Sequence, residues 1–207
     1  MNDNMNLKIS DMLFPTDNDL EIPTLDIDMQ AQQCTIPFLC FGEQKRTYNL
    51  NHSGALHFYT DDYRFNAIYE HPEKILQHNP SEIIEPNGSL YNEMPISFGL
   101  QAIYKKRWIA RVMQIKGIRV FVDLNVAQKY YQLNMIGVPR GWYAFATRGY
   151  SDRLNNLEFE YSIAKDWAEG KNLTYMFNGY KAAKTEEARK NYEKEINLYI
   201  EKAKKNK

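Results

Sequence analysis

Several apolar stretches of this sequence end on acidic, amide or basic side chains, which are the groups that bind polar ligands and exchange protons. The first stretch, residues 55–60, runs directly into two adjacent carboxylates, Asp61 and Asp62. Later stretches lead to further residues of this kind: Glu85, Asn87, Ser89, Asp123, Asn125, Thr147, Arg148 and Asn178. An apolar run with a polar end is typical of a buried strand that delivers polar groups to one edge of a sheet.

These residues divide by their chemistry into candidate roles. The candidate catalytic residues are Asp61, Asp62, Glu85, Asp123 and Arg148, because carboxylates exchange protons and a guanidinium binds phosphate or carboxylate through its fork of donors. The candidate ligand-binding residues are Asn87, Ser89, Asn125, Thr147 and Asn178. Carboxylates crowded at one edge repel one another, so Asp62, Glu85 and Asp123 would need a raised pKa or a divalent cation such as Mg²⁺.

Structural roles could explain the same residues. Asp and Asn at strand ends often cap the following helix or form a turn. Arg148 fits an ion pair with Asp61, Asp62 or Asp123 as well as it fits an anion site. His57 lies within its apolar stretch and is typical of a core histidine.

One segment of the longest predicted helix, residues 104–108, places basic and aromatic residues side by side. Such a sequence occurs in proteins that bind single-stranded nucleic acid. The helical spacing instead favours Trp108 on the apolar face, with Lys105 and Lys106 on a solvated face.

The elements that must position these side chains alternate between strands and helices. Five strands are predicted at residues 55–60, 81–84, 119–124, 142–146 and 173–177, and residues 34–41, which contain Pro37, fit an edge strand. The longest helix is expected at residues 94–116 and should end at Gly117. This alternation predicts an α/β fold with a mainly parallel sheet of successive βα units, either open or part of an irregular TIM-like barrel.

A parallel sheet brings the carboxyl ends of its strands to one edge. We therefore expect Asp62, Glu85, Asp123 and Arg148 to meet in one cleft, where Arg148 would keep at least one carboxylate ionised.

Composition narrows the function classes. The 207 residues contain 26 basic and 26 acidic residues, so the net charge does not support direct nucleic-acid binding. No G-x-S-x-G, P-loop or G-x-G-x-x-G motif occurs, which argues against an α/β-hydrolase, a P-loop ATPase and a dinucleotide enzyme. Only two cysteines and no long apolar run are present, so we expect a cytoplasmic protein without membrane contact.

Charge is unevenly distributed along the chain. Residues 1–29 hold seven acidic residues and one lysine, whereas residues 181–207 hold nine basic and five acidic residues. We predict an acidic extended arm at 1–33, a single α/β domain at 34–180 and a charged helix at 181–207. The LFP and IPTLDI pieces of the arm could still pack on the domain, and the oppositely charged ends could join two copies into a homo-oligomer.

Four segments carry a resemblance to a known family: HFYTDDYRFNAIYEHPEKIL, IIEPNGSLYNEMPISFGLQAIYKKRW, KGIRVFVDLNV and GVPRGWYAFATRG. The chain resembles the DUF4417 domain family of bacteria and phages over about residues 50–180. The resemblance implies a phage or mobile-element context and brings no assigned activity.

Two function hypotheses follow. In the first, the protein is an enzyme or a binder that holds a nucleotide-like or phosphorylated ligand at the carboxyl ends of its strands. In the second, it is a non-enzymatic interaction protein that binds a nucleic-acid-processing partner, or another copy of itself, through its charged ends.

Overall fold

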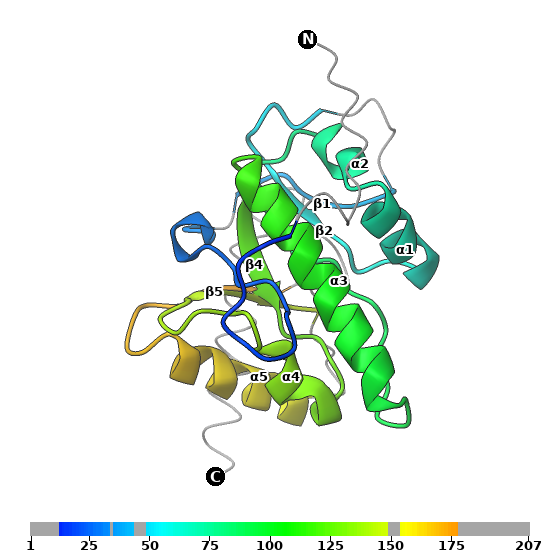
Figure 1. The fold of residues 1–207 in the computed structure, drawn as a ribbon. Helices are drawn as coiled ribbons and strands as arrows, with labels where there is room; N and C mark the ends of the chain where they lie inside the picture. Colours follow the sequence, from blue (N-terminus) through cyan, green and yellow to red (C-terminus); the bar gives the residue numbers. More distant parts are fainter. Residues whose placement is uncertain (1–12, 34, 44–48, 149–153, 178–207) are drawn as a thin grey trace.

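Six parallel strands form one sheet in the computed structural model, which describes residues 13–33, 35–43, 49–148 and 154–177 (Figure 1). The strands lie in chain order across the sheet: β1 (Phe38–Cys40), β2 (Ala55–His57), β3 (Glu82–Ile84), β4 (Arg119–Asp123), β5 (Ala144–Thr147) and β6 (Thr174–Phe177). The pairing of neighbouring strands places Cys40 opposite His57, Ile83 opposite Val120 and Val122 opposite Phe145. Since β1 and β6 form the two edges, the sheet is open.

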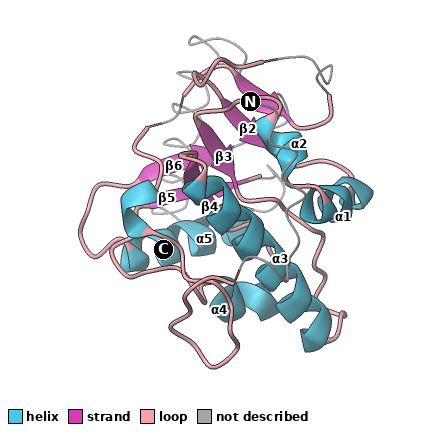
Figure 2. Ribbon diagram, turned by 45° about the horizontal axis from the view of Figure 1, so that its top comes forward, coloured by secondary structure: helices cyan, strands magenta, loops and turns pink. Residues whose placement is uncertain are grey.

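The strand order confirms the predicted α/β class and favours an arc of a barrel over a doubly wound sheet. In a doubly wound sheet the strand order reverses at one point, whereas here every connection moves one strand further in the same direction. Connections of the usual right hand then place all helices on one face. Figure 2 shows α1, α3, α4 and α5 along one side of the strands.

The helices fill the connections between strands. They are α1 (Asp62–Glu70) and α2 (Glu73–Leu76) before β3, α3 (Ile96–Ile115) before β4, η3 (Gln128–Tyr130) and α4 (Tyr131–Asn134) before β5, and α5 (Leu154–Trp167) before β6. The predicted long helix is confirmed as α3, and Gly117 follows it with a φ of +79°, a left-handed conformation that suits glycine. No helix within the described residues is both long and apolar enough to cross a membrane.

The core lies between the sheet and its helices. Every residue of β2, β3 and β5 is buried, which is usual for strands of a parallel sheet. Trp108 on α3 is completely buried, which confirms its predicted place on the apolar face. The short edge strand predicted near Pro37 is confirmed as β1, which pairs only with β2.

The described part of the N-terminal segment, residues 13–33, packs across the amino ends of the central strands. Ile22, Leu25 and Ala31 are buried, so the IPTLDI piece contributes to the core. The backbone N–H of Ala31 donates to the carbonyl of Val120 at 2.9 Å, next to an isolated parallel bridge between Gln30 and Val120. Residues 1–12 of the predicted arm and the predicted helix at 181–207 lie outside the described residues.

Candidate functional site

Two carboxylates from adjacent strand ends meet two cationic side chains of α3. Glu85 directly follows β3 and Asp123 is the last residue of β4, while Lys106 and Arg107 are consecutive on α3. Arg107 donates to the Glu85 carboxylate, and Lys106 Nζ lies 3.8 Å from Glu85 Oε2 and 3.9 Å from Asp123 Oδ2. Glu85, Asp123 and Arg107 are fully buried and Lys106 is 3% exposed. The result is a buried ionic cluster of two carboxylates and two cations.

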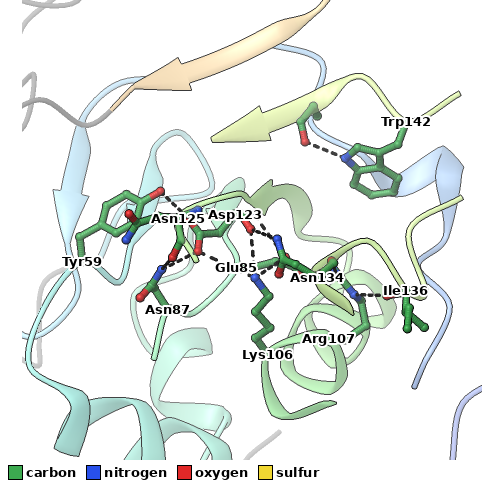
Figure 3. Close-up of polar contacts among 11 residues, drawn as sticks. Tyr59, Glu85, Asn87, Lys106, Arg107, Asp123, Asn125, Asn134, Ile136 and Trp142 are labelled. Carbon is green, nitrogen blue, oxygen red and sulfur yellow. Dashed lines mark hydrogen bonds and ion pairs between the residues drawn. The ribbon is translucent and has the colours of Figure 1, made fainter. Parts of the chain in front are cut away.

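Neutral donors also hydrogen-bond to the Asp123 carboxylate. Tyr59 donates its hydroxyl to Oδ1 at 2.8 Å, Asn87 donates Nδ2 to Oδ2 at 2.6 Å, and the backbone N–H of Asn125 reaches Oδ1 at 3.2 Å. Figure 3 shows Lys106 extending from α3 to this group, with Tyr59 and Asn87 on the other side of Asp123. Both oxygens of Asp123 are therefore already occupied.

Burial shifts the protonation equilibria inside this cluster. It raises the pKa of Asp123 and lowers the pKa of Lys106, because a charge is less stable away from water. Lys106 and the hydrogen bonds from Tyr59 and Asn87 oppose the shift of Asp123. Removing one member would therefore leave another buried without its counter-charge or hydrogen bond.

The two adjacent aspartates lie at the start of α1, beyond the end of β2. Asp61 is exposed, precedes the helix and makes no side-chain capping bond, whereas Asp62 is its first residue. Asp62 Oδ1 accepts hydrogen bonds from the backbone N–H and the hydroxyl of Ser89, both at 3.0 Å. Asp62 thus fastens the loop whose Asn87 contacts Asp123, and it joins the site through that loop.

The remaining predicted residues follow β5 and β6. Thr147 ends β5 and is buried, and Arg148 follows it with an exposed side chain. Burial and, to a lesser extent, the Arg148 charge lower the pKa of His57 to about 3, so this core histidine is neutral. The guanidinium that pairs with Glu85 belongs to Arg107, and contact of Arg148 with the acidic residues stays a prediction. Asn178 lies outside the described residues.

The structure thus joins Glu85, Asn87, Asp123 and Asn125 in one contacting group and links Asp62 to Ser89 beside it. Donors within the protein already bind the carboxylate oxygens of Glu85 and Asp123, which leaves these two residues little capacity for a cation. In the described ranges, no group of three or more His, Cys, Asp and Glu side chains is arranged to hold a metal ion.

The sequence prediction for Lys106 was wrong, and Arg107 was missed. Ile103, Lys106, Arg107 and Ala110 are all buried on α3, and their spacing of i, i+3, i+4 and i+7 puts them on one helix face. Two charges enclosed by apolar residues on one face were the available signal for a buried ionic cluster. Tyr59 and Asn134, which donates Nδ2 to the Asp123 carbonyl at 2.9 Å, carried no signal of this kind.

Comparison with known proteins identifies the family. A family model described as a domain of unknown function, DUF4417, matches residues 14–165. The chain belongs to the DUF4417 family. The DUF4417 match begins well before the segments on which the resemblance rested. It therefore includes most of the described N-terminal segment as well as Asp61, Asp62, Glu85, Asp123 and Arg148.

Two curated relatives of this DUF4417 protein come from phages. The Gene 1 protein of Mycobacterium phage D29 is 31% identical over 115 residues, which cover 53% of this chain and 40% of the relative. The Gene 1 protein of Mycobacterium phage L5 is 36% identical over 77 residues, or 36% of this chain and 34% of the relative. The chain therefore spans less than half the length of either relative. Both agree with the expected phage context, and no solved structure matches the chain.

Proposed function

We propose that the carboxyl edge of the sheet binds a nucleotide-like or other phosphorylated small molecule, as an enzyme or as a binding protein. The observation that carries this proposal is the rigid polar group at that edge. Asn87 donates to Asp123 and also to the Asn125 carbonyl at 2.8 Å, while its side chain remains partly exposed. An amide held in this way can contact a ligand without first losing conformational freedom.

Spacing and charge both support a phosphorylated ligand. Arg148 follows β5 and Asn87 follows β3, and one strand separates them, so two strand spacings of about 4.8 Å give roughly 10 Å between their positions. A phosphate on Arg148 and a sugar or base on Asn87 and Asn125 would cover that span. The buried cluster has two negative and two positive groups, so it does not oppose an incoming anion.

In this proposal the predicted catalytic residues take different roles. Glu85 and Asp123 act as positioning residues, because their oxygens are bound by donors within the protein. Asp61 is exposed and remains available to a ligand hydroxyl. Perturbed pKa values at Asp123, Lys106 and His57 gather at the same edge, a distribution typical of functional sites.

The alternative, an interaction protein that uses its charged ends, stays a prediction. Among the described acidic residues of the N-terminal segment, Asp26 lies 3.6 Å from Arg111, and Asp17 accepts a hydrogen bond from Thr24 at 2.8 Å. These internal contacts reduce what the segment can offer to a partner. Residues 1–12 and 181–207, on which the alternative chiefly depends, lie outside the described residues.

Isothermal titration of the whole chain tests the proposal. The ligands are uridine 5′-monophosphate, adenosine 5′-monophosphate, ribose 5-phosphate, their unphosphorylated forms and inorganic phosphate. At least one phosphorylated compound should bind, and Arg148→Ala should weaken it by about 1.5–3 kcal/mol, roughly 10- to 150-fold, the contribution of a hydrogen bond to a charged group.

Arg140→Ala is the matched control, because Arg140 is an exposed arginine that pairs with Asp166 and Glu169 before β5. It should leave affinity unchanged. The proposal fails if no compound binds, or if Arg148→Ala and Arg140→Ala have the same effect. Under the alternative, neutralising Lys202, Lys204 and Lys205 would abolish partner binding, whereas the proposal expects no loss of ligand affinity.

A further inference from the structure

The carboxyl edge of the sheet carries an exposed aromatic ring whose orientation is fixed. Tyr63 is the second residue of α1 and is 66% exposed. Arg64 donates Nε to the Tyr63 hydroxyl at 3.0 Å, and its guanidinium lies over the Tyr63 ring, 5.5 Å from the ring centre. Because so much of the ring is exposed, a planar group can still stack on it.

The chain that follows β1 holds Arg64 in place. Its Nη1 donates to the Phe41 carbonyl at 3.4 Å, and its guanidinium lies so close to Gly42 that a Cβ at that position would overlap it. Gly42 has a φ of +85°, a backbone conformation that suits glycine. Since Arg64 supports the Tyr63 ring from this neighbouring segment, a ligand that stacks on the ring has little side-chain freedom to remove.

Tyr63 lies beside the loop of the proposed ligand site. Its neighbour Asp62 accepts two hydrogen bonds from Ser89, and the same loop carries Asn87. In the strand order, β2 lies next to β3 on the side away from β5, so α1 starts one strand beyond Asn87 as seen from Arg148. A base whose edge contacts Asn87 can therefore place its face on Tyr63, which keeps the base where the proposed function puts it.

Charge sets the direction of the ligand along this edge. Asp61 and Asp62 are exposed carboxylates directly before Tyr63, and together they outnumber the single positive charge of Arg64. Arg148, after β5, is an exposed cation. A phosphate is repelled at the first place and attracted at the second. The phosphate therefore belongs at Arg148 and the uncharged end of the ligand at Tyr63.

We propose that Tyr63 is the stacking platform for the base of a nucleotide, with Arg64 as the residue that positions its ring. This inference rests on the proposed function and narrows it, because a sugar phosphate without a base would leave the ring unused. Every base has a π-face, so an aromatic platform of this kind selects nucleotides as a class rather than one particular base.

Isothermal titration of the whole chain compares adenosine 5′-monophosphate with ribose 5-phosphate, which has the same phosphate and sugar but no base. Adenosine 5′-monophosphate should bind the wild type more tightly. Tyr63→Ala should weaken its binding roughly 5- to 150-fold, the range for one base stacked on an aromatic ring, and should leave ribose 5-phosphate unchanged. Tyr63→Phe keeps the ring and should retain most of the difference between the two ligands.

Two further variants separate stacking from a structural effect. Phe98→Ala removes another exposed aromatic ring, 60% exposed on the first turn of α3, and should leave both affinities unchanged. Arg64→Ala leaves the Tyr63 ring present but unfixed, so it should lower the ratio of the two affinities by less than Tyr63→Ala does. The same ratio in Tyr63→Ala as in the wild type overturns the inference, and so does an equal fall of the ratio in Phe98→Ala.

Adenosine, which has the base but no phosphate, separates failure of this inference from failure of the proposed function. In the isotope-labelled chain it should shift the amide resonances of Arg64 and Ser89 saturably, and Tyr63→Ala should abolish these shifts. If that happens while no phosphorylated compound binds, the platform stands and the proposed function is wrong. If adenosine 5′-monophosphate binds through Arg148 with equal affinity in the wild type and Tyr63→Ala, the proposed function stands and the platform is wrong. If neither compound binds, both are wrong.

Discussion

The two ends of the sheet hold buried carboxylates by different means. At the amino end, Glu82 opens β3 and accepts hydrogen bonds from the backbone N–H and the hydroxyl of Thr35, at 3.0 Å and 2.7 Å. At the carboxyl end, Glu85 and Asp123 lie against the cations of Lys106 and Arg107. The carboxyl end therefore combines opposite charge with neutral donors, whereas the Glu82 carboxylate accepts its hydrogen bonds from neutral donors.

The source of the partners differs as well. At the amino end the bonds other than those of Glu82 come from the N-terminal segment: Gln114 of α3 donates to and accepts from the Asp26 backbone at 2.9 Å, and Gln30 Oε1 accepts from the Tyr143 N–H at 2.8 Å. At the carboxyl end they come from the βα units themselves, which leaves Asn87, Asn125 and Arg148 partly or fully exposed. The amino end is closed by added chain, whereas the carboxyl end keeps polar groups at the surface, the division of roles known from barrel enzymes.

The sharpest test of this difference removes a cation from the carboxyl end. Arg107→Met should lower the free energy of unfolding by about 3–5 kcal/mol, because it leaves Glu85 buried without its main counter-charge. Arg140→Met, at an exposed ion pair, should cost no more than about 1 kcal/mol. Urea denaturation measures both.

A double variant shows whether the pairing itself is responsible. Glu85→Gln combined with Arg107→Met removes both charges and should recover part of the loss. A cost below about 1 kcal/mol for Arg107→Met alone would mean that the ionic cluster does not hold the carboxyl end together.

The pH dependence of stability should also come from the carboxyl end. Burial of Glu160 on α5 raises its pKa from 4.5 when unfolded to about 8 when folded, so the folded state holds an extra proton between these values. Its contribution is fully present below about pH 4.5 and is lost as pH rises through about 8. At roughly 1.4 kcal/mol per pKa unit, the loss amounts to a few kcal/mol.

Denaturation at a series of pH values measures this slope, and Glu160→Gln should remove it between about pH 6 and 8. Glu82→Gln is the control at the amino end, and it should leave the slope near pH 8 in place. An unchanged slope in Glu160→Gln would assign the proton to another group.

A milder loss is expected when the amino end is opened. Gln114→Ala removes two hydrogen bonds to the Asp26 backbone and should cost about 1–3 kcal/mol. Hydrogen exchange should become faster at Leu25 and Ala31 before it changes in β2 and β3. Gln101→Ala, an exposed position of the same helix, should have almost no effect. If hydrogen exchange becomes faster by the same factor in all strands, the N-terminal segment does not open independently of the sheet.

The smallest effect distinguishes the two adjacent aspartates. Asp62→Asn weakens the bonds from Ser89 and removes a charge that favours the start of α1, so it should cost about 0.5–1 kcal/mol. Asp61→Asn should change stability by less than about 0.5 kcal/mol, since Asp61 makes no capping bond. If thermal denaturation shows the same loss of stability for both variants, the bonds between Asp62 and Ser89 do not stabilise the fold.

The sheet was predictable because a buried strand of a parallel sheet is apolar without interruption. Val120, Phe121 and Val122 form such a run, and Gly117 marks the preceding helix end. However, an apolar run shows which residues are buried more directly than it shows which residues pair with a neighbouring strand. Phe58 and Tyr59 are 2% and 8% exposed although β2 already ends at His57, so the apolar run extends past the strand.

The site was less predictable because its contacts are distant in sequence. Lys106 is buried only because Glu85 and Asp123 reach it from two different strands, and no local spacing reveals that. Ile22, Leu25 and Ala31 follow no helical or strand period, since the irregular segment makes each contact separately. The approximate positions of the strand ends could be predicted from the sequence, but the side chains that contact one another there could not.

The sequential strand order has a consequence for how the protein is made on the ribosome. Each new strand pairs with the one synthesised just before it, so the sheet can grow from β1 toward β6 as the chain emerges. The N-terminal segment is the exception, because Gln30 and Ala31 contact Val120, about 90 residues later. This segment can therefore make those contacts only after β4 has been synthesised, and pulse-labelled refolding should show Ala31 protected after β2 and β3.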